Sequence, residues 1–235
     1  MPAQIPRRWR FLLRAPFLLG APAALGALAL LDAPLAGAAL GVLALGLLLP
    51  LFEGLSGFRF PVRLHVGIVL YSAAAILVGE WLDVYEALAG WDVLLHALSA
   101  AVLAVLGMGL ALTATGGARP RVALWVLAVL AYGFSMMVGA MWELMEFGLD
   151  QVFALGTQKG AVDTMSDFVA NAAGAAWGAW AALLAAAHGR GPAPAGMLPE
   201  FMGANPVLFP AWRPPSEREV RGPLAGKDRP LERGR

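Results

Sequence analysis

The stretch DVLLHALSAAVLAVLGMGLALTAT, residues 92–115, decides the fold of this chain because it is long, apolar and free of proline. A membrane-spanning helix needs about 20 consecutive apolar residues to cross a hydrocarbon core of about 30 Å. The ionisable residues of the stretch are Asp92 and His96, and both lie in its first turns. The stretch is therefore predicted to be a transmembrane helix with one polar end.

Similar apolar segments fill most of the remaining chain. Hydrophobic residues make up 59% of the 235 residues and charged residues 14%, whereas a soluble domain carries about 25% charged residues. The chain is therefore predicted to be an all-α, polytopic membrane protein, a bundle of about six transmembrane helices. The predicted spans are 12–31, 34–52, 64–82, 92–115, 122–147 and 164–187.

This pattern divides the chain into a basic cytoplasmic N-terminus (1–11), a six-helix transmembrane domain (12–188) and a Pro/Arg-rich cytoplasmic tail (189–235). The tail is predicted to be disordered because it cannot bury enough apolar surface to fold. A basic N-terminus followed by an apolar run also fits a signal peptide. The run continues into a second span without a small-x-small cleavage site, so we expect the first helix to be retained.

Basic residues alternate between the two ends of the predicted spans. Three of the five connections between spans hold a single basic residue in total, Lys159. Under the positive-inside rule, the basic side is cytoplasmic and both termini lie in the cytoplasm. The basic groups are Arg7, Arg8, Arg10 and Arg14, then Arg59 and Arg63, then Arg119 and Arg121, and finally Arg190 and the arginines after it.

Composition also limits the chemistry of the chain. The sequence has no cysteine, which excludes disulfides, thiolate metal sites and cysteine nucleophiles. A net charge of +1 predicts no nucleic-acid partner. The lipid bilayer is the expected partner, and the oligomeric state is left open.

Polar residues recur at helical spacing at one end of the last three spans, which is the predicted extracytoplasmic end. Residues three or four apart share one face of a helix, so each span presents a polar stripe. An ionisable side chain inside a bilayer costs about 2.5–3.5 kcal/mol on insertion scales and is therefore a candidate functional residue. The stripes are Asp92 and His96, then Glu143 and Glu146, then Asp163, Asp167 and Asn171.

The positions of these residues in their helices favour metal binding. Carboxylates are favoured at a helix N-terminus, where Asp163 and Asp167 lie, and disfavoured at a C-terminus, where Glu143 and Glu146 lie. The glutamates should therefore bind a cation, pair with a base or carry a proton. A neutral His96 beside carboxylates offers the ligands that a divalent metal ion accepts.

We therefore predict a possible divalent metal site formed by His96, Glu143, Glu146, Asp163 and Asp167, with Asp92 and Asn171 in supporting positions. Simpler explanations exist for all of these residues except Asp167. The aspartates at the helix starts, Asp92 and Asp163, could be N-caps. The two glutamates could face interfacial water, and His96 could make an interhelical hydrogen bond. Asn171 could join two helices by a hydrogen bond.

Three motifs resemble a known family. They are WDVLLHALSA (91–100), MWELMEF (141–147) and GTQKGAVDTMSDFVANAAGA (156–175). Together they resemble the YjdF-like bacterial inner-membrane proteins, with D-x-x-x-H, W-E-x-x-E and D-T-x-x-D-x-x-x-N-x-x-G-A helices. Ser166 departs from the tryptophan of the closest relatives. A more distant resemblance is to VanZ-like membrane proteins. The resemblance implies a bacterial inner-membrane location and a shared polar site, but no reaction.

The leading functional hypothesis is an integral membrane protein with an extracytoplasmic polar pocket that binds a divalent cation or a polar envelope ligand. Three alternatives use the same residues. An enzyme acting on an envelope lipid or glycan would use Glu143 or Glu146 as general base, assisted by His96. A proton- or cation-coupled transporter would use the carboxylates as a relay. A structural or assembly role would need no ligand.

Overall fold

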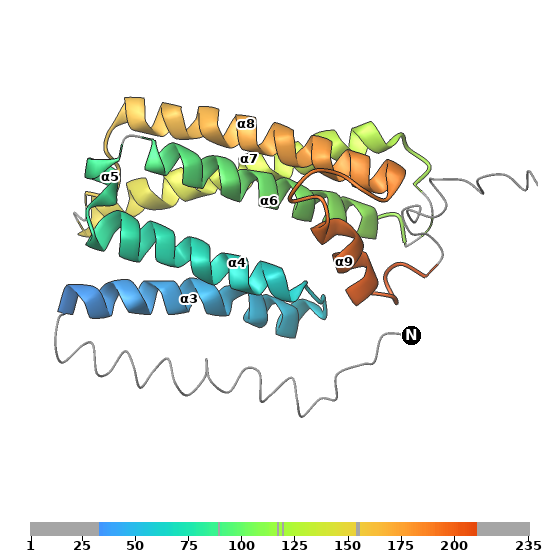
Figure 1. Cartoon of the computed structure of the whole chain (residues 1–235), viewed down its shortest axis with the longest axis horizontal. Helices are drawn as coiled ribbons and strands as arrows, with labels where there is room; N and C mark the ends of the chain where they lie inside the picture. Colours follow the sequence, from blue (N-terminus) through green and yellow to red (C-terminus); the bar gives the residue numbers. More distant parts are fainter. Residues whose placement is uncertain (1–32, 89, 117, 119, 154–155, 211–235) are drawn as a thin grey trace, which may run out of the picture. The chain divides into compact units, whose positions relative to one another are not determined.

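The computed structural model describes residues 33–88, 90–116, 118, 120–153 and 156–210, and every regular element among them is helical (Figure 1). This confirms the predicted all-α class. One element, η2, is a π-helix that continues directly from α4. The elements are α3 (Ala33–Ser56), α4 (Val62–Ser72), η2 (Ala73–Trp81), α5 (Val84–Ala87), α6 (Trp91–Thr113), α7 (Leu124–Phe153), α8 (Ala161–His188) and α9 (Met197–Ala204).

Five helices of the described chain are long and apolar enough to cross a membrane. They match the second to sixth predicted spans, and α7 ends six residues beyond the predicted boundary at 147. The first predicted span, 12–31, lies outside the described residues. The five candidate spans are Leu35–Ser56, Val62–Trp81, Trp91–Thr113, Leu124–Phe153 and Ala161–His188.

Glycines set several helix boundaries. Gly57 follows α3 with φ of 75°, and its N–H donates to the carbonyl of Glu53 at 3.1 Å. Gly189 follows α8 with φ of 71° and donates to the carbonyl of Ala185 at 2.9 Å. Glycine adopts this left-handed conformation without a Cβ penalty, so it ends a helix readily. At the other end of α8 the N-cap is Gly160.

The chain forms two compact units. The first contains α3, α4, η2 and α5. Within it, Gly41 and Gly46 of α3 leave room for Ile76 of η2 and Val69 of α4. Methyl groups of these two side chains lie 3.1 and 3.2 Å from the positions that a Cβ would take at the glycines. Small residues that admit a neighbouring side chain are a common way for membrane helices to pack.

In the second unit, α6 contacts α8 through backbone. A Cβ at Gly174 would collide with the carbonyl oxygen of Ala97, and a Cβ at Gly178 with that of Ala101. This repeated glycine-to-carbonyl contact keeps the axes of α6 and α8 close together. Because the glycines are four residues apart, the contact runs along one face of α8. Figure 1 shows α6, α7 and α8 side by side.

The third helix of this unit, α7, packs on α6 in a similar way. A Cβ at Gly107 would lie 3.0 Å from the carbonyl oxygen of Ala131. One turn further along α7, the buried hydroxyl of Ser135 donates to the carbonyl of Ala100 at 2.8 Å. Interhelical hydrogen bonds of this kind tie membrane helices together where no water is available. The three helices therefore form a tight core of small residues.

Helix α9 shows that part of the C-terminal region is helical and not disordered. The sequence predicts disorder for 189–235, but α9 forms within this segment and buries Leu198, Phe201 and Met202. Phe201 fills the space beside Gly109 of α6, with ring atoms 3.0 and 3.1 Å from the position that a Cβ would take there. The apolar residues of MLPEFMGA thus find a partner that the local sequence does not indicate. Residues 211–235 lie outside the described chain.

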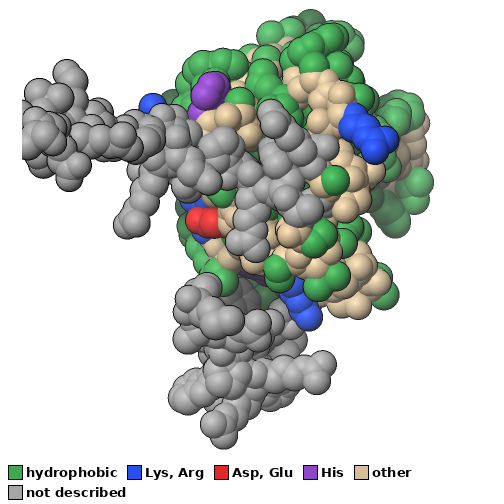
Figure 2. Space-filling model, turned by 90° about the vertical axis from the view of Figure 1, so that its right-hand side faces the viewer, with side chains coloured by type: hydrophobic (Ala, Val, Ile, Leu, Met, Phe, Trp, Pro, Cys, Tyr) green, Lys and Arg blue, Asp and Glu red, His purple; other side chains and the backbone are tan. Residues whose placement is uncertain are grey.

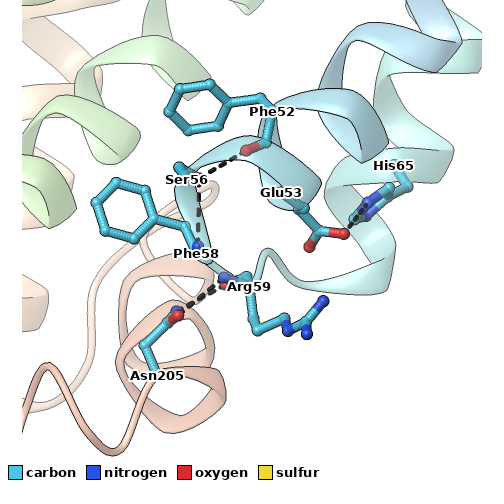
Figure 3. Close-up of polar contacts among 7 residues, drawn as sticks. All are labelled: Phe52, Glu53, Ser56, Phe58, Arg59, His65 and Asn205. Carbon is cyan, nitrogen blue, oxygen red and sulfur yellow. Dashed lines mark hydrogen bonds and ion pairs between the residues drawn. The ribbon is translucent and has the colours of Figure 1, made fainter. Parts of the chain in front are cut away.

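Asn205 fixes this C-terminal segment to the short stretch Arg59–Pro61, which belongs to the same unit. Its Oδ1 accepts from the backbone N–H of Arg59 at 2.8 Å, and its Nδ2 donates to the carbonyl of Arg59 at 2.7 Å (Figure 3). The same Nδ2 also donates to the carbonyl of Phe201 at 2.7 Å. Phe60 stacks on Phe201 with ring centroids 5.3 Å apart. Asn205 is 5% exposed, so these bonds are shielded from water.

Candidate metal centre

The centre of the site is a pair of buried side chains from two neighbouring helices. His96 lies in the second turn of α6 and Asp167 in the second turn of α8. The Nε2 of His96 is 3.8 Å from the Oδ1 of Asp167. The residues are 7% and 2% exposed, respectively. A buried carboxylate is costly unless a base, hydrogen bonds or a cation compensate its charge, and the imidazole is one such partner.

Asp92 lies one turn before His96 on the same continuous helix, α6, and is half-buried. Asp92, His96 and Asp167 each offer one ligand atom, and these three atoms lie within 4.8 Å of one another. The sequence alone predicts only a supporting position for Asp92. Its contribution to the group follows from the four-residue spacing, which puts its carboxylate on the face of α6 that carries His96.

Glu143 of α7 lies at the same level as this group. Gly139 of α7 faces the side chain of Asn171 of α8, and a Cβ at this glycine would lie 2.7 Å from Nδ2 of the asparagine. The two helices follow each other in the chain and run antiparallel. One turn onward from Gly139 is Glu143, and one turn back from Asn171 is Asp167, so the two carboxylates occupy one layer. Glu143 is 5% exposed.

Asn171 lies one helical turn after Asp167 on α8 and is the last polar residue of this layer. It is 2% exposed, and its Nδ2 donates no hydrogen bond to any residue that the structure describes. A buried amide donor normally has an acceptor. The layer thus combines a buried imidazole, buried carboxylates and a buried amide N–H at one end of the bundle.

Three predicted ligands are not part of the group of three: Glu143, which lies in the same layer, and Glu146 and Asp163. Glu146 is half-buried, and its Oε1 accepts a hydrogen bond from the indole Nε1 of Trp142 at 3.0 Å. Asp163 is also half-buried and lies one turn before Asp167. The N-cap alternative does not hold for Asp92 or Asp163, because α6 begins at Trp91 and α8 begins at Ala161 after Gly160.

Asp150 has a role that helical spacing alone did not reveal. The sequence predicts that this span ends at 147, but α7 continues to Phe153. Asp150 accepts hydrogen bonds from the N–H and hydroxyl of Thr157, each at 2.8 Å, and from the N–H of Gln158 at 2.8 Å. It therefore shapes the loop before α8. In the sequence, the signal for this contact was that Thr157 and Gln158 follow Asp150 at a distance of seven and eight residues.

A further buried carboxylate, Glu53, was not predicted from the sequence. It lies in α3 of the first unit and is 5% exposed. Its Oε2 is 3.4 Å from the Nε2 of His65 in α4 (Figure 3). The predicted site residues all lie at one end of the last three spans, so this pair is not among them. Two polar residues near the ends of adjacent predicted helices were the signal that could have indicated it.

The long apolar helices and the buried polar layer define an integral membrane protein. The chain belongs to the family described as "Predicted membrane protein (DUF2238)", which matches residues 15–189. The YjdF-like resemblance is consistent with this membership, whereas no comparison supports the VanZ-like resemblance. No curated protein and no solved structure matches the chain.

Proposed function

We propose that this membrane protein binds a divalent cation in the polar layer of α6, α7 and α8. The observation that carries the proposal is the convergence of Asp92, His96 and Asp167, whose ligand atoms lie within 4.8 Å of one another. These residues come from two helices that glycine contacts hold together. A polar envelope ligand that donates hydrogen bonds to the same carboxylates is the second form of the proposal.

The distances between the ligand atoms suit a metal ion. Two ligand atoms about 2.1 Å from one ion are at most about 4.2 Å apart. The separation of 3.8 Å between His96 and Asp167 falls within this limit. A small inward movement of the Asp92 carboxylate would complete a three-ligand site. One imidazole and two carboxylates suit zinc, manganese or iron(II), and exclude a preference for soft, thiolate-binding ions.

Electrostatics supports the same proposal. Asp167 and Glu143 are both buried in one layer of an apolar bundle. Two carboxylates in low dielectric repel each other, and a divalent cation between them would remove that repulsion. We assign Glu143 to the layer beside the ion and Glu146 and Asp163 to the entrance, where their half-buried carboxylates attract cations.

The experiment is metal analysis of purified protein. We expect the wild type, stripped with chelator and then dialysed against Zn²⁺ or Mn²⁺, to retain about one ion per chain and to unfold at a higher temperature than the stripped form. His96→Gln and Asp167→Asn should each abolish retention, because each removes one ligand. Asp163→Asn is the matched control on the same helix and should retain the ion.

A structural role for the His96–Asp167 pair predicts a different pattern. In that case wild type retains no ion after dialysis, added metal leaves its unfolding temperature unchanged, and Asp167→Asn lowers that temperature with or without metal. This pattern would overturn the metal proposal. Retention that is equal in wild type and in Asp167→Asn would overturn the assignment of the ligands.

We also propose the inner membrane of a bacterium as the location, with both termini in the cytoplasm and the polar layer facing the extracytoplasmic side. The alternation of basic residues and the YjdF-like motifs support this. Alkaline phosphatase is active only outside the cytoplasm, so it should be active when inserted after Gly160 and inactive when fused after Arg235. The reverse result would invert the orientation.

A further inference from the structure

A pocket lies at the end of α8 opposite to the polar layer. It has a volume of about 370 Å³ and is lined by Leu184, His188, Arg190 and Gly191. The pocket forms where Gly189 ends the helix and the chain turns back along it. Gly191 packs against α8 so closely that a Cβ there would lie 2.7 Å from the carbonyl oxygen of Ala181.

The position of this pocket along α8 matches the far boundary of a bilayer. Asp167 and His188 are 21 residues apart on one helix, which corresponds to about 31 Å at 1.5 Å per residue. The hydrocarbon core of a membrane is about 30 Å thick. If the polar layer lies at one boundary of the core, the pocket lies at the headgroup region of the other.

The polar side chains of the pocket are available for a ligand. The side chains of His188 and Arg190 are exposed, and neither side chain makes a hydrogen bond or ion pair in the part of the chain that the structure describes. Arginine presents several N–H donors in a planar fork that fits two oxygens of a phosphate. Figure 2 shows basic, histidine and acidic side chains among hydrophobic and other residues on one face of the molecule.

An apolar stripe leads from the pocket along α8. Trp177, Trp180, Leu184 and His188 follow at steps of three or four residues, so they share one face. The two indole rings are 5.2 Å apart, and each tryptophan is 48% exposed. The indole N–H of Trp177 donates to the carbonyl of Ala193 at 2.8 Å, which fixes the returning chain beside the stripe.

We propose that this pocket and stripe form a binding site for one anionic phospholipid. The phosphate is bound by Arg190 and His188, and an acyl chain lies along Trp177, Trp180 and Leu184. The charge of the pocket favours an anionic headgroup over a zwitterionic one. This site lies at the opposite end of α8 from the polar layer, so its test is independent of the proposed function.

Native mass spectrometry of the full-length protein tests the proposal. The protein is exchanged into micelles containing equal amounts of phosphatidylglycerol and phosphatidylcholine with the same acyl chains. We expect one phosphatidylglycerol to remain bound in preference to phosphatidylcholine. The double variant Arg190→Gln/His188→Gln should lose most of this preference, at least fivefold. Arg121→Gln, which removes another exposed arginine, should keep it.

Further arms separate the possible outcomes. If inorganic phosphate at millimolar concentration displaces the lipid completely, the site binds free phosphate and the lipid assignment is wrong. If the double variant keeps the wild-type preference, the pocket is not the site. Trp180→Ala should weaken retention while leaving the preference between headgroups unchanged, since it removes only apolar surface. If the double variant does not fold, Arg190→Gln alone takes its place, because it replaces only one exposed side chain. It should also weaken the preference for phosphatidylglycerol.

Discussion

The imidazole Nε2 of His96 on α6 lies 3.8 Å from the carboxylate Oδ1 of Asp167 on α8, and both side chains are buried. The two residues are 71 positions apart in the chain, which follows from their numbers. They meet because glycines on α8 allow that helix to approach α6. This contact between two helices is the basis of the proposed site and of the first prediction.

Breaking the His96–Asp167 pair should destabilise the protein strongly. His96→Ala leaves the buried carboxylate of Asp167 without its imidazole partner, which costs about 3–5 kcal/mol for buried pairs. Unfolding of the metal-free protein in detergent measures the change. His188→Ala is the control, because His188 is exposed and its side chain pairs with no carboxylate in the part of the chain that the structure describes, so the loss should be smaller. Equal losses in the two variants would show that the buried pair has no special role.

The contact of α6 with α8 should be intolerant of any added side-chain atom. Gly174→Ala places a methyl group against the carbonyl of Ala97, and backbone cannot move aside as a side chain can. Overpacking of this kind costs about 1–3 kcal/mol, so we expect a lower unfolding temperature and weaker metal retention. Gly133→Ala on α7 is the matched control, since no atom lies within 4 Å of its Cβ position. A stable Gly174→Ala would contradict the tight α6–α8 contact.

Asn205 should determine whether α9 stays docked. Asn205→Ala removes three hydrogen bonds to the backbone of Arg59 and Phe201. The bond to Phe201 is buried, and losing it costs about 1–3 kcal/mol, whereas the two part-buried bonds to Arg59 contribute less. We expect faster proteolysis within 197–210 in the variant. Asn205→Leu, which has a similar volume and no polar atoms, should cleave as fast as Asn205→Ala if the hydrogen bonds hold α9, and as slowly as wild type if packing alone does.

Asp150 should control the order of the loop before α8. Asp150→Ala removes the acceptor of three hydrogen bonds from Thr157 and Gln158. We expect faster amide hydrogen exchange at Thr157 and Gln158, because both N–H groups lose their partner. Thr157→Val removes only the contacts of the hydroxyl, with Asp150 and with the carbonyl of Glu146, and should leave the exchange at Gln158 near that of wild type. Unchanged exchange in Asp150→Ala would mean that other contacts order this loop.

The sequence predicted the described spans well because a membrane helix is a local feature. Its length and apolarity depend only on consecutive residues, and the bilayer imposes both. Helix α7 ends at Phe153 and not at the predicted 147, because apolarity along the chain does not indicate where a helix stops once it has left the apolar segment. Helix α9 was missed because MLPEFMGA is too short and too mixed in polarity to predict a helix without its partner at Gly109.

The candidate site stays a prediction that spacing supports only within each helix. Helical spacing groups Asp92 with His96 and Asp167 with Asn171, since residues four apart share a face. Spacing could not decide that Asp92 joins His96 and Asp167 while Glu146 and Asp163 lie apart. That choice depends on how each helix is rotated about its axis relative to its neighbours.

The sequence by itself determined that this chain is an apolar helical membrane protein with polar residues at one end of its last three spans. Both properties follow from composition and from periodicity within one helix. The tertiary structure decided which polar residues meet and where α9 docks. The physical reason is that helix rotation and separation are set by contacts between distant positions. Gly174 and Gly178 set the rotation and separation of α8 relative to α6, and the space beside Gly109 accommodates the ring of Phe201.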